Sequence, residues 1–270
     1  MSTSTRATPR WAGRGAGRAT VSTVRLTLLH TRYAVTETVR IPVAVVGTVV
    51  FPALTLLVFI VPQTALAQDP AGATGAVAQL AVFGAMSVAL FTHGAGIAED
   101  RALPWDTHLR TLPVGPVPRF VARVLLGAVF ALAALVPLVV VALLFTAATT
   151  TPGRFLGALG GLLLAGVPLL ALGLAIGFTL PAKAALAVAQ VLLLPLAFAG
   201  GLFLPPSTMP GWLAAVSVLT PTRAGRDLVV GLATGTDVPS SALPVMLAWT
   251  VLLGAVAVLA VRRDEGRRFR

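Results

Sequence analysis

Six long apolar stretches constrain this chain more than any other feature: five contain no Asp, Glu, Lys or Arg, and the third contains only Arg123, at its start. Each has about 20 residues, enough to cross a hydrocarbon layer of about 30 Å as a helix. A single charge at mid-span would cost about 2.5–3.5 kcal/mol on the insertion scale. The sequence therefore predicts an all-α membrane protein with six transmembrane helices, at about residues 43–61, 76–97, 121–148, 155–180, 185–204 and 242–261.

The composition agrees with a membrane protein and excludes several kinds of chemistry. Hydrophobic residues make up 57% of the chain and charged residues 11%, whereas soluble domains carry about 25% charged residues. The chain has no cysteine, which excludes disulfides, thiol catalysis and cysteine-based metal sites. Lys183 is the only lysine among 20 basic residues. This arginine bias, with many Ala, Gly, Val and Leu residues, indicates a high-GC bacterium. We expect the predicted membrane protein to lie in the bacterial cytoplasmic membrane.

The basic residues divide unequally between the two sides of the predicted spans. Seventeen lie in the N-terminus, the loop after the second span, the turn at Lys183 and the C-terminal tail, whereas the other side has only Arg154, Arg223 and Arg226. By the positive-inside rule the majority side is cytoplasmic, so both termini are predicted to be cytoplasmic. Basic tails beside the inner leaflet would attract anionic lipid, and we expect no nucleic-acid partner.

The two ends of the chain differ from the membrane domain predicted over residues 21–261. Residues 1–20 are rich in Ser, Thr, Gly and Arg and should be disordered. Residues 262–270 form a second basic tail. Apolar residues recur at helical intervals between Val21 and Arg40, with charges between them, which predicts an amphipathic helix on the cytoplasmic membrane surface; a soluble lead-in helix is the alternative. Ala65-Leu66-Ala67 resembles a signal-peptidase site, but the preceding polar region of 40 residues favours a retained first span.

The loop Ala98–Arg123 between the second and third spans is long and patterned. It begins with charges and continues into an apolar segment that ends in prolines. Such a segment suits docking into a groove on a soluble partner. A solvated loop with ordinary juxtamembrane charges is the alternative.

The segment Pro205–Ser241 on the opposite side contains two apolar stretches, Trp212–Leu219 and Leu228–Ala233, that are too short to span a bilayer. Prolines and glycines bound them. The pattern predicts a re-entrant helix pair that dips into the outer leaflet, which is allowed where protein or a water-lined cavity surrounds the backbone. A simple surface loop is the alternative.

Together these features resemble the permease subunit of type-2 ATP-binding-cassette (ABC-2) exporters, a group that includes drug-resistance, polyketide-antibiotic and polysaccharide export permeases. The resemblance extends from about Val21 over nearly the whole chain and rests on the six-span order and on loose motifs. These motifs are Glu99-Asp100-Arg101 to Leu112-Pro113-Val114, and Phe203-Leu204-Pro205 through Met209-Pro210-Gly211-Trp212 to Pro221-Thr222-Arg223.

The resemblance implies a role for each segment. Residues 21–40 would be the connecting helix, and two permeases, identical or paralogous, would assemble with two ATPase subunits. Coupling to the partner ATPase would fall on Glu99, Asp100, Arg101, Trp105, Leu109, Leu112 and Pro113. The extracellular gate would include Pro205, Met209, Pro210, Trp212, Pro221 and Arg223.

The chain lacks a phosphate-binding loop of the Gly-x-x-x-x-Gly-Lys-Ser/Thr type. We therefore expect a transport subunit rather than an enzyme, with no cofactor of its own, and with ATP and magnesium bound by the partner ATPase. Three scattered histidines and no acidic residue in any span make a metal site improbable.

Polar residues within the spans are few. Gln190 in the fifth span is a candidate for the translocation path, and a helix-to-helix hydrogen bond is the simpler interpretation. His93 near the cytoplasmic end of the second span could sense protons, but an interfacial histidine with satisfied hydrogen bonds is favoured. In the fourth span Gly153, Gly157, Gly161 and Ala165 follow one another at four-residue spacing, which suits packing within the bundle or, alternatively, a dimer seam.

The leading hypothesis is an ATP-driven exporter permease for a hydrophobic or amphipathic small molecule, such as a drug, an antibiotic or a lipid-like compound. The uncharged spans favour such a cargo over an ion or a sugar. A proton-coupled secondary multidrug transporter is the alternative, although it would need intramembrane carboxylate or histidine relays. An intramembrane enzyme would need carboxylates or a Ser/His pair at a cavity, and only Glu99, Asp100 and Asp106 cluster.

Overall fold

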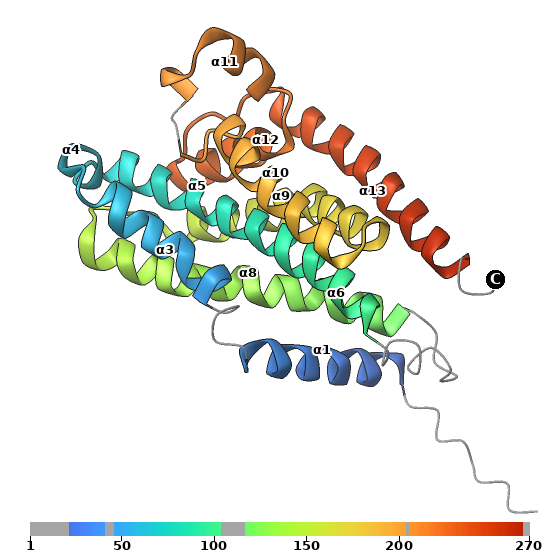
Figure 1. Ribbon diagram of the computed structural model, residues 1–270. Helices are drawn as coiled ribbons and strands as arrows, with labels where there is room; N and C mark the ends of the chain where they lie inside the picture. The colour runs from blue at the N-terminus through green and yellow to red at the C-terminus, as the bar shows by residue number, and fades with distance from the viewer. Residues whose placement is uncertain (1–21, 41–45, 104–116, 204–205, 267–270) are drawn as a thin grey trace, which may run out of the picture.

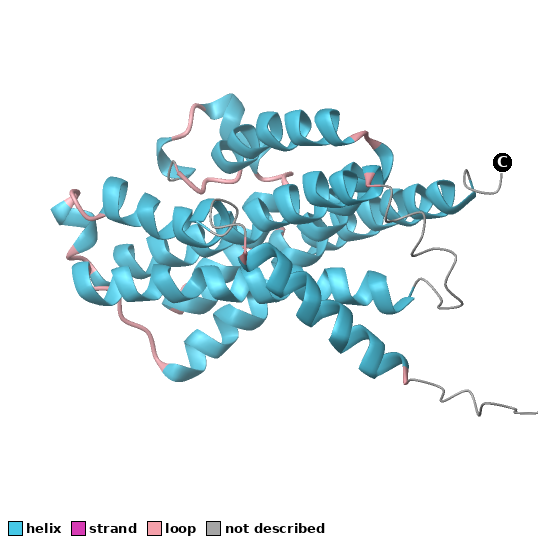
Figure 2. Ribbon diagram, turned by 60° about the horizontal axis from the view of Figure 1, so that its bottom comes forward, coloured by secondary structure: helices cyan, strands magenta, loops and turns pink. Residues whose placement is uncertain are grey.

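The computed structural model describes residues 22–40, 46–103, 117–203 and 206–266, and every regular element in these ranges is a helix (Figures 1 and 2). The predicted all-α class is thereby confirmed. Five helices in the described ranges are long and apolar enough to cross a membrane, and a sixth apolar helix is shorter, at Thr48–Ile60. The predicted tail at residues 1–20 lies outside the described residues.

The long helices follow the predicted spans, with shifted ends. The second span is one uninterrupted run of α5 (Pro70–Val88), the π-helix η3 (Ala89–Ala95) and α6 (Gly96–Ala102), and the others are α8 (Val117–Phe145), α9 (Pro152–Thr179), α10 (Ala182–Ala199) and α13 (Ala242–Gly266). α5 begins six residues before the predicted start because Asp69 caps it, accepting a hydrogen bond from the Gly72 N–H at 2.7 Å. Thr151 caps α9 in the same way.

The first predicted span, within the described residues, is one helical run that changes between π- and α-helical hydrogen bonding. It consists of the π-helix η1 (Val46–Val50), α3 (Phe51–Thr55) and the π-helix η2 (Leu56–Ile60), and the short α4 (Thr64–Ala67) follows it. Pro52 stands just after the junction of η1 and α3. Because proline has no N–H and its ring crowds the preceding turn, regular α-helical hydrogen bonding is interrupted there.

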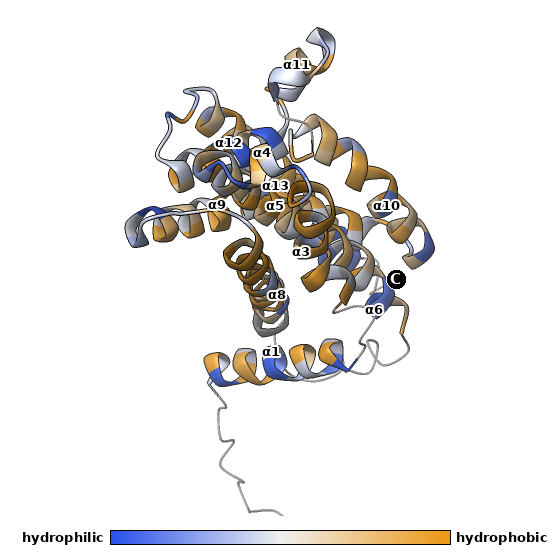
Figure 3. Ribbon diagram, turned by 90° about the vertical axis from the view of Figure 1, so that its left-hand side faces the viewer, coloured by the Kyte–Doolittle hydropathy of each residue, from blue (hydrophilic) through white to orange (hydrophobic). Residues whose placement is uncertain are grey.

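The N-terminal helix α1 (Thr23–Val39) lies along the outside of α8, as Figure 1 shows. Val35 packs with Leu126 and Phe130 of α8. In contrast, Val24 and Leu28, which belong to the predicted apolar stripe, are 67% and 60% exposed. Part of that stripe therefore faces away from the bundle. Figure 3 shows hydrophilic and hydrophobic residues interleaved on α1, whereas α8 is hydrophobic along most of its length.

α5 is the central helix of the bundle. Its most apolar stretch is 83% buried, against 22% for α8 and 17% each for α10 and α13. Phe83 of α5 is fully buried, and its ring lies 5.7 Å from that of Phe51 and 4.9 Å from that of Phe203. α8 packs on α1, α3 and α5, while α9 packs on α12 (Pro221–Thr234), α13 and η3. These two consecutive helices thus both contact α5 but otherwise pack on different partners.

The small residues of α9 serve packing inside this chain. A Cβ at Gly161 would lie 2.8 Å from Leu232 of α12, and one at Gly225 of α12 would lie 2.8 Å from the Cβ of Ala165. The close approach of α9 and α12 therefore depends on Gly161 and Gly225. This confirms packing within the bundle at Gly161 and Ala165, whereas Gly153 faces open space.

Candidate functional site

Two ion pairs join the helix ends around the predicted coupling loop. Asp100, at the end of α6, pairs with Arg123 of α8 at 2.7 Å. These residues lie just before and just after the segment 104–116, which is outside the described residues. The pair therefore joins α6 to α8 at the base of the loop. Glu99 is exposed beside it.

Arg101, the next residue, reaches in another direction. Its Nη2 lies 2.5 Å and its Nε 3.1 Å from Oδ1 of Asp264, near the end of α13. Its Nη1 donates to the Gly177 carbonyl of α9 at 2.7 Å, and its guanidinium stands 5.8 Å from the centre of the Phe178 ring. Asp264 is only 8% exposed. We call Asp100, Arg101, Arg123 and Asp264 the inner charge cluster.

The inner charge cluster joins four elements, α6, α8, α9 and α13, at one end of the bundle. Sequence reasoning singled out Asp100 and Arg101 but missed Arg123 and Asp264 as their partners. Asp264 was assigned to a basic tail, whereas it belongs to α13, which continues to Gly266. Of the predicted coupling residues, Glu99, Asp100 and Arg101 lie together at this end, and four others lie outside the described residues: Trp105, Leu109, Leu112 and Pro113.

At the other end of the bundle α11 (Gly211–Ser217) and α12 form a helix–turn–helix, the segment predicted as a re-entrant pair. Thr220 caps α12, accepting from the Arg223 N–H at 3.2 Å, and Pro221 occupies the first turn. Oγ of Ser217 donates to the Ala199 carbonyl, which ties α11 to α10. The turn between α11 and α12 is also tied to α13, because Nε1 of Trp249 donates to the Leu219 carbonyl at 2.7 Å.

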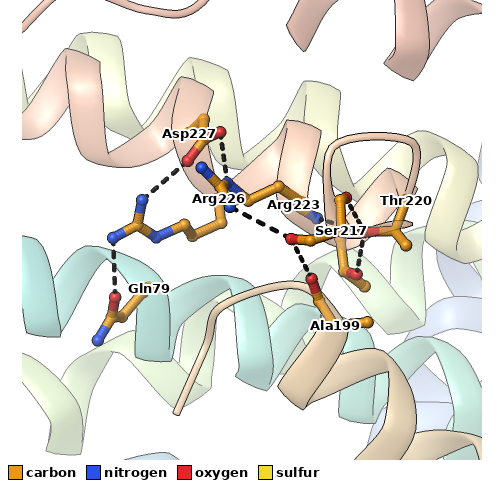
Figure 4. Close-up of polar contacts among 8 residues, drawn as sticks. Gln79, Ala199, Ser217, Thr220, Arg223, Arg226 and Asp227 are labelled. Atoms are coloured by element: carbon orange, nitrogen blue, oxygen red, sulfur yellow. Dashed lines mark hydrogen bonds and ion pairs between the residues drawn. The ribbon is translucent and has the colours of Figure 1, made fainter. Parts of the chain in front are cut away.

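α12 carries three charged side chains that pack into the bundle (Figure 4). Asp227 accepts from Nε of Arg223 at 2.6 Å and from Nη1 of Arg226 at 2.8 Å. The side chains of Asp227, Arg223 and Arg226 are 10%, 15% and 17% exposed. Nη2 of Arg226 donates to Oε1 of Gln79 on α5 at 3.4 Å, and Nη1 of Arg223 donates to Ser217 at 3.2 Å. We call Gln79, Ser217, Arg223, Arg226 and Asp227 the outer polar cluster.

The outer polar cluster contains only part of the predicted gate. Arg223 belongs to it, and Pro221 starts the helix that carries it. Trp212 is 71% exposed on α11, and Met209 and Pro210 precede that helix; Pro205 lies outside the described residues. Sequence reasoning missed Gln79. The only feature that could have indicated it is its amide side chain, which is unusual in a largely apolar span.

Two further polar residues have different environments. Gln190 is exposed on α10 and points away from the core of this chain. His93 of η3 is buried, 3% exposed, and its Nε2 lies 3.0 Å from the Arg123 carbonyl, to which it donates because a carbonyl only accepts. Its Nδ1 is buried near the Val88 backbone without a well-formed hydrogen bond. The prediction of a fully satisfied histidine therefore holds for one nitrogen only.

The packing around His93 requires glycine, which has no Cβ, on the two neighbouring helices. A Cβ at Gly127 of α8 would collide with the imidazole, and one at Gly173 of α9 would collide with the Ala89 carbonyl. The π-helical turn η3 is thus held between two glycine-lined surfaces. Among the described residues there is no group of three or more His, Cys, Asp or Glu side chains that could hold a metal ion.

Comparison with known proteins agrees with this architecture. A search of curated proteins found no match. The family model described as "ABC-2 type transporter" matches residues 26–233, which is more than half of the chain and runs from α1 through α12. Permeases of this family normally work with a separate ATP-binding subunit and are not themselves catalytic. With its apolar helices and this match, the chain belongs to the ABC-2 type transporter family as an integral membrane permease.

Proposed function

We propose that this chain is the permease subunit of an ATP-driven exporter that moves a hydrophobic or amphipathic small molecule out of the cell. ATP would be hydrolysed with magnesium on a separate cassette ATPase. Two permeases, identical or paralogous, would assemble with two such ATPases in a bacterial cytoplasmic membrane. The termini would be cytoplasmic, so the inner charge cluster would face the ATPase and the outer polar cluster the outside.

The observation that carries the proposal is the inner charge cluster at the base of the coupling loop. A push on residues 104–116 would act on α6 and α8 together, because Asp100 and Arg123 join the two ends of the loop. Arg101 would pass the same push to α9 and α13 through Gly177 and Asp264. The geometry suits a chain that receives force at this loop.

The helix–turn–helix of α11 and α12 supports an outer gate. Its buried ion pairs make α12 a rigid unit, and its contacts with α5, α9 and α13 would couple it to the same helices that meet the inner charge cluster. Gln190, exposed on α10, would face the second permease or the path between the two.

The test is transport by the full chain co-expressed with a candidate cassette ATPase, in inside-out vesicles to which a lipophilic fluorescent dye or a fluorescent phospholipid analogue is added from the medium. We expect transport that requires ATP and is lost without the ATPase.

The Asp100→Asn variant should bind the ATPase but show weaker stimulation of ATP hydrolysis, whereas Asp237→Asn, the same change at an exposed outer position, should behave as the parent. No association with any cassette ATPase would refute the proposal.

The alternative is a proton-coupled secondary transporter, and the buried His93 is the observation that favours it. On that mechanism a proton gradient alone would drive dye movement, and His93→Gln would abolish it. On the proposed mechanism a proton gradient without ATP gives no transport.

A further inference from the structure

A cleft opens sideways between α8 and α9, with α5 as its floor. Its outer part is a cavity of about 370 Å³ lined by α5, α8, α9 and α12, and its inner part is a cavity of about 180 Å³ lined by α5, η3, α8 and α9. Leu162 of α9 lines both. We call the two cavities together the side cleft. It lies where α8 and α9, which pack largely on different partners, both border the buried surface of α5.

The side cleft is as long as the hydrocarbon layer is thick. Its lining on α8 runs from Val124 to Leu143. At 1.5 Å per residue that is about 28 Å, against about 30 Å for a bilayer core. The outer cavity alone has a volume typical of small-molecule sites, which range from about 300 to 1,000 Å³.

The lining chemistry selects an apolar occupant. The side cleft is lined mainly by Ala, Val, Leu and Phe side chains, and its polar lining residues are His93 in the inner cavity and Thr74, Thr149 and Thr150 at the outer end. The hydroxyls at its outer end are already used, since Thr74 donates to the Thr149 and Pro70 carbonyls and Thr150 donates to the Ala233 carbonyl. A water molecule needs two to four polar partners to occupy a cavity. The outer cavity therefore offers little to water or to a polar ligand.

The surroundings of the side cleft are apolar too. On α8, Val136 is 64% exposed and Leu143 70% exposed, and Leu164 on α9 is 55% exposed. Helices with such side chains on their surface border hydrocarbon in a bilayer. A dry, apolar cleft that opens toward hydrocarbon is filled at least cost by the hydrocarbon chain of a neighbouring lipid.

A cation stands at the outer end of the side cleft. Arg154 directly precedes Phe155, which lines the outer cavity, and its guanidinium lies beside Gly235. Among the described residues its side chain has no hydrogen bond or ion pair. A guanidinium at this level is placed to bind a lipid phosphate whose tail runs down the cleft.

We propose that the side cleft is a binding site for a membrane phospholipid, with one acyl chain between α8 and α9 and the phosphate at Arg154. The proposal depends on the membrane location of the chain and does not require the bound lipid to be the transported cargo. Failure of ATP-driven dye transport would therefore leave it intact.

The test uses the full chain in nanodiscs of phosphatidylethanolamine and phosphatidylglycerol, doped with a phosphatidylglycerol that carries a photoreactive diazirine in its acyl chain. Labelled peptides are mapped by mass spectrometry. We expect label to concentrate on the cleft-lining parts of α8 and α9, well above the exposed surface of α13 around Leu247 and Val251.

Two variants of α9 form a matched pair. Ala158→Phe fills the outer cavity and should lower cleft labelling by about tenfold or more, equivalent to about 1.4 kcal/mol of binding free energy. Gly160→Phe, two residues away, adds the same side chain where a Cβ meets nothing within 4 Å, and should leave cleft labelling unchanged. Arg154→Gln should reduce labelling by a diazirine phospholipid more than labelling by a diacylglycerol with the same diazirine chain, which lacks the phosphate, so the difference isolates the phosphate contact.

Three results would overturn the proposal. One is even labelling over all exposed apolar helices. Another is equal cleft labelling of Ala158→Phe and Gly160→Phe, with both variants correctly folded by their unfolding midpoints. The third comes from a separate experiment without the lipid probe, in which cysteines replace Leu135 and Leu159. A disulfide cross-link between two chains at these positions would show that a second copy covers the side cleft.

Discussion

Breaking the ion pair between Arg101 and Asp264 should destabilise the chain more than any change on its surface. Asp264 receives two hydrogen bonds from the Arg101 guanidinium, and both side chains are largely shielded, at 22% and 9% exposure. Removing one partner of a buried pair typically costs 3–5 kcal/mol, because the other charge is left without compensation. Since Arg101 is about one-fifth exposed and water can reach it, we expect about 3 kcal/mol for Asp264→Ala.

Arg101→Ala should cost about 1 kcal/mol more than Asp264→Ala, because it also leaves the Gly177 carbonyl without its donor. The double variant should cost much less than the sum of the two single changes, with a coupling energy of about 2 kcal/mol or more. The assay is reversible unfolding of the four proteins in mixed micelles, followed by circular dichroism. Arg263→Ala, an exposed arginine on the same turn of α13, is the control and should stay within about 0.5 kcal/mol of the parent.

Additive costs for the single and double variants would refute this reasoning, since independent residues add and paired residues do not. So would an Asp264→Ala protein as stable as Arg263→Ala. Either result would mean that the end of α13 is not anchored by the ion pair, and that a push on the coupling loop has no route to α13 through Arg101.

The remaining predictions concern the middle and the outer end of the bundle. Gly173→Leu should destabilise the chain by about 3 kcal/mol or prevent its folding, because its Cβ would collide with the Ala89 carbonyl of η3; Gly160→Leu, in open space, should be tolerated, as unfolding midpoints will show. Asp227→Asn should cost about 3 kcal/mol and expose α12 to protease, because two arginines lose their shared counter-ion. Gln79→Leu should cost less, about 1 kcal/mol, since Arg226 keeps Asp227; equal protease resistance of both variants would contradict the role of the outer polar cluster.

Sequence reasoning located the long helices because the free-energy cost of charge in hydrocarbon leaves a strong local signal. Their ends were harder to place. Asp69 and Thr151 set the starts of α5 and α9 through side-chain caps, which a hydropathy window does not register. The two π-helices that flank Phe51–Thr55 were also not predicted. Pro52 indicates a kink, but the sequence does not show how the hydrogen bonds of the neighbouring turns change.

For the two polar clusters, the sequence indicated some of the residues but not their partners. Arg101 was singled out, but its partner Asp264 lies 163 residues away and has no pattern that links the two. Arg226 and Gln79 are 147 residues apart, and their contact exists only because α12 packs on α5. Long-range pairing of this kind is a property of the packed bundle, so composition, periodicity and spacing cannot reveal it.

The run from Pro70 to Ala102 links both clusters in one element. Gln79 near its outer end holds Arg226, and Arg101 at its inner end holds Asp264. Helices transmit displacement along their axis when their hydrogen bonds are regular, and a π-helical turn is the place where they are not. η3 is that place here, held between Gly127 and Gly173. Force that travels along this run from the coupling loop to the outer polar cluster passes through η3. Side chains added at Gly127 or Gly173 should therefore disturb coupling even where the fold survives them.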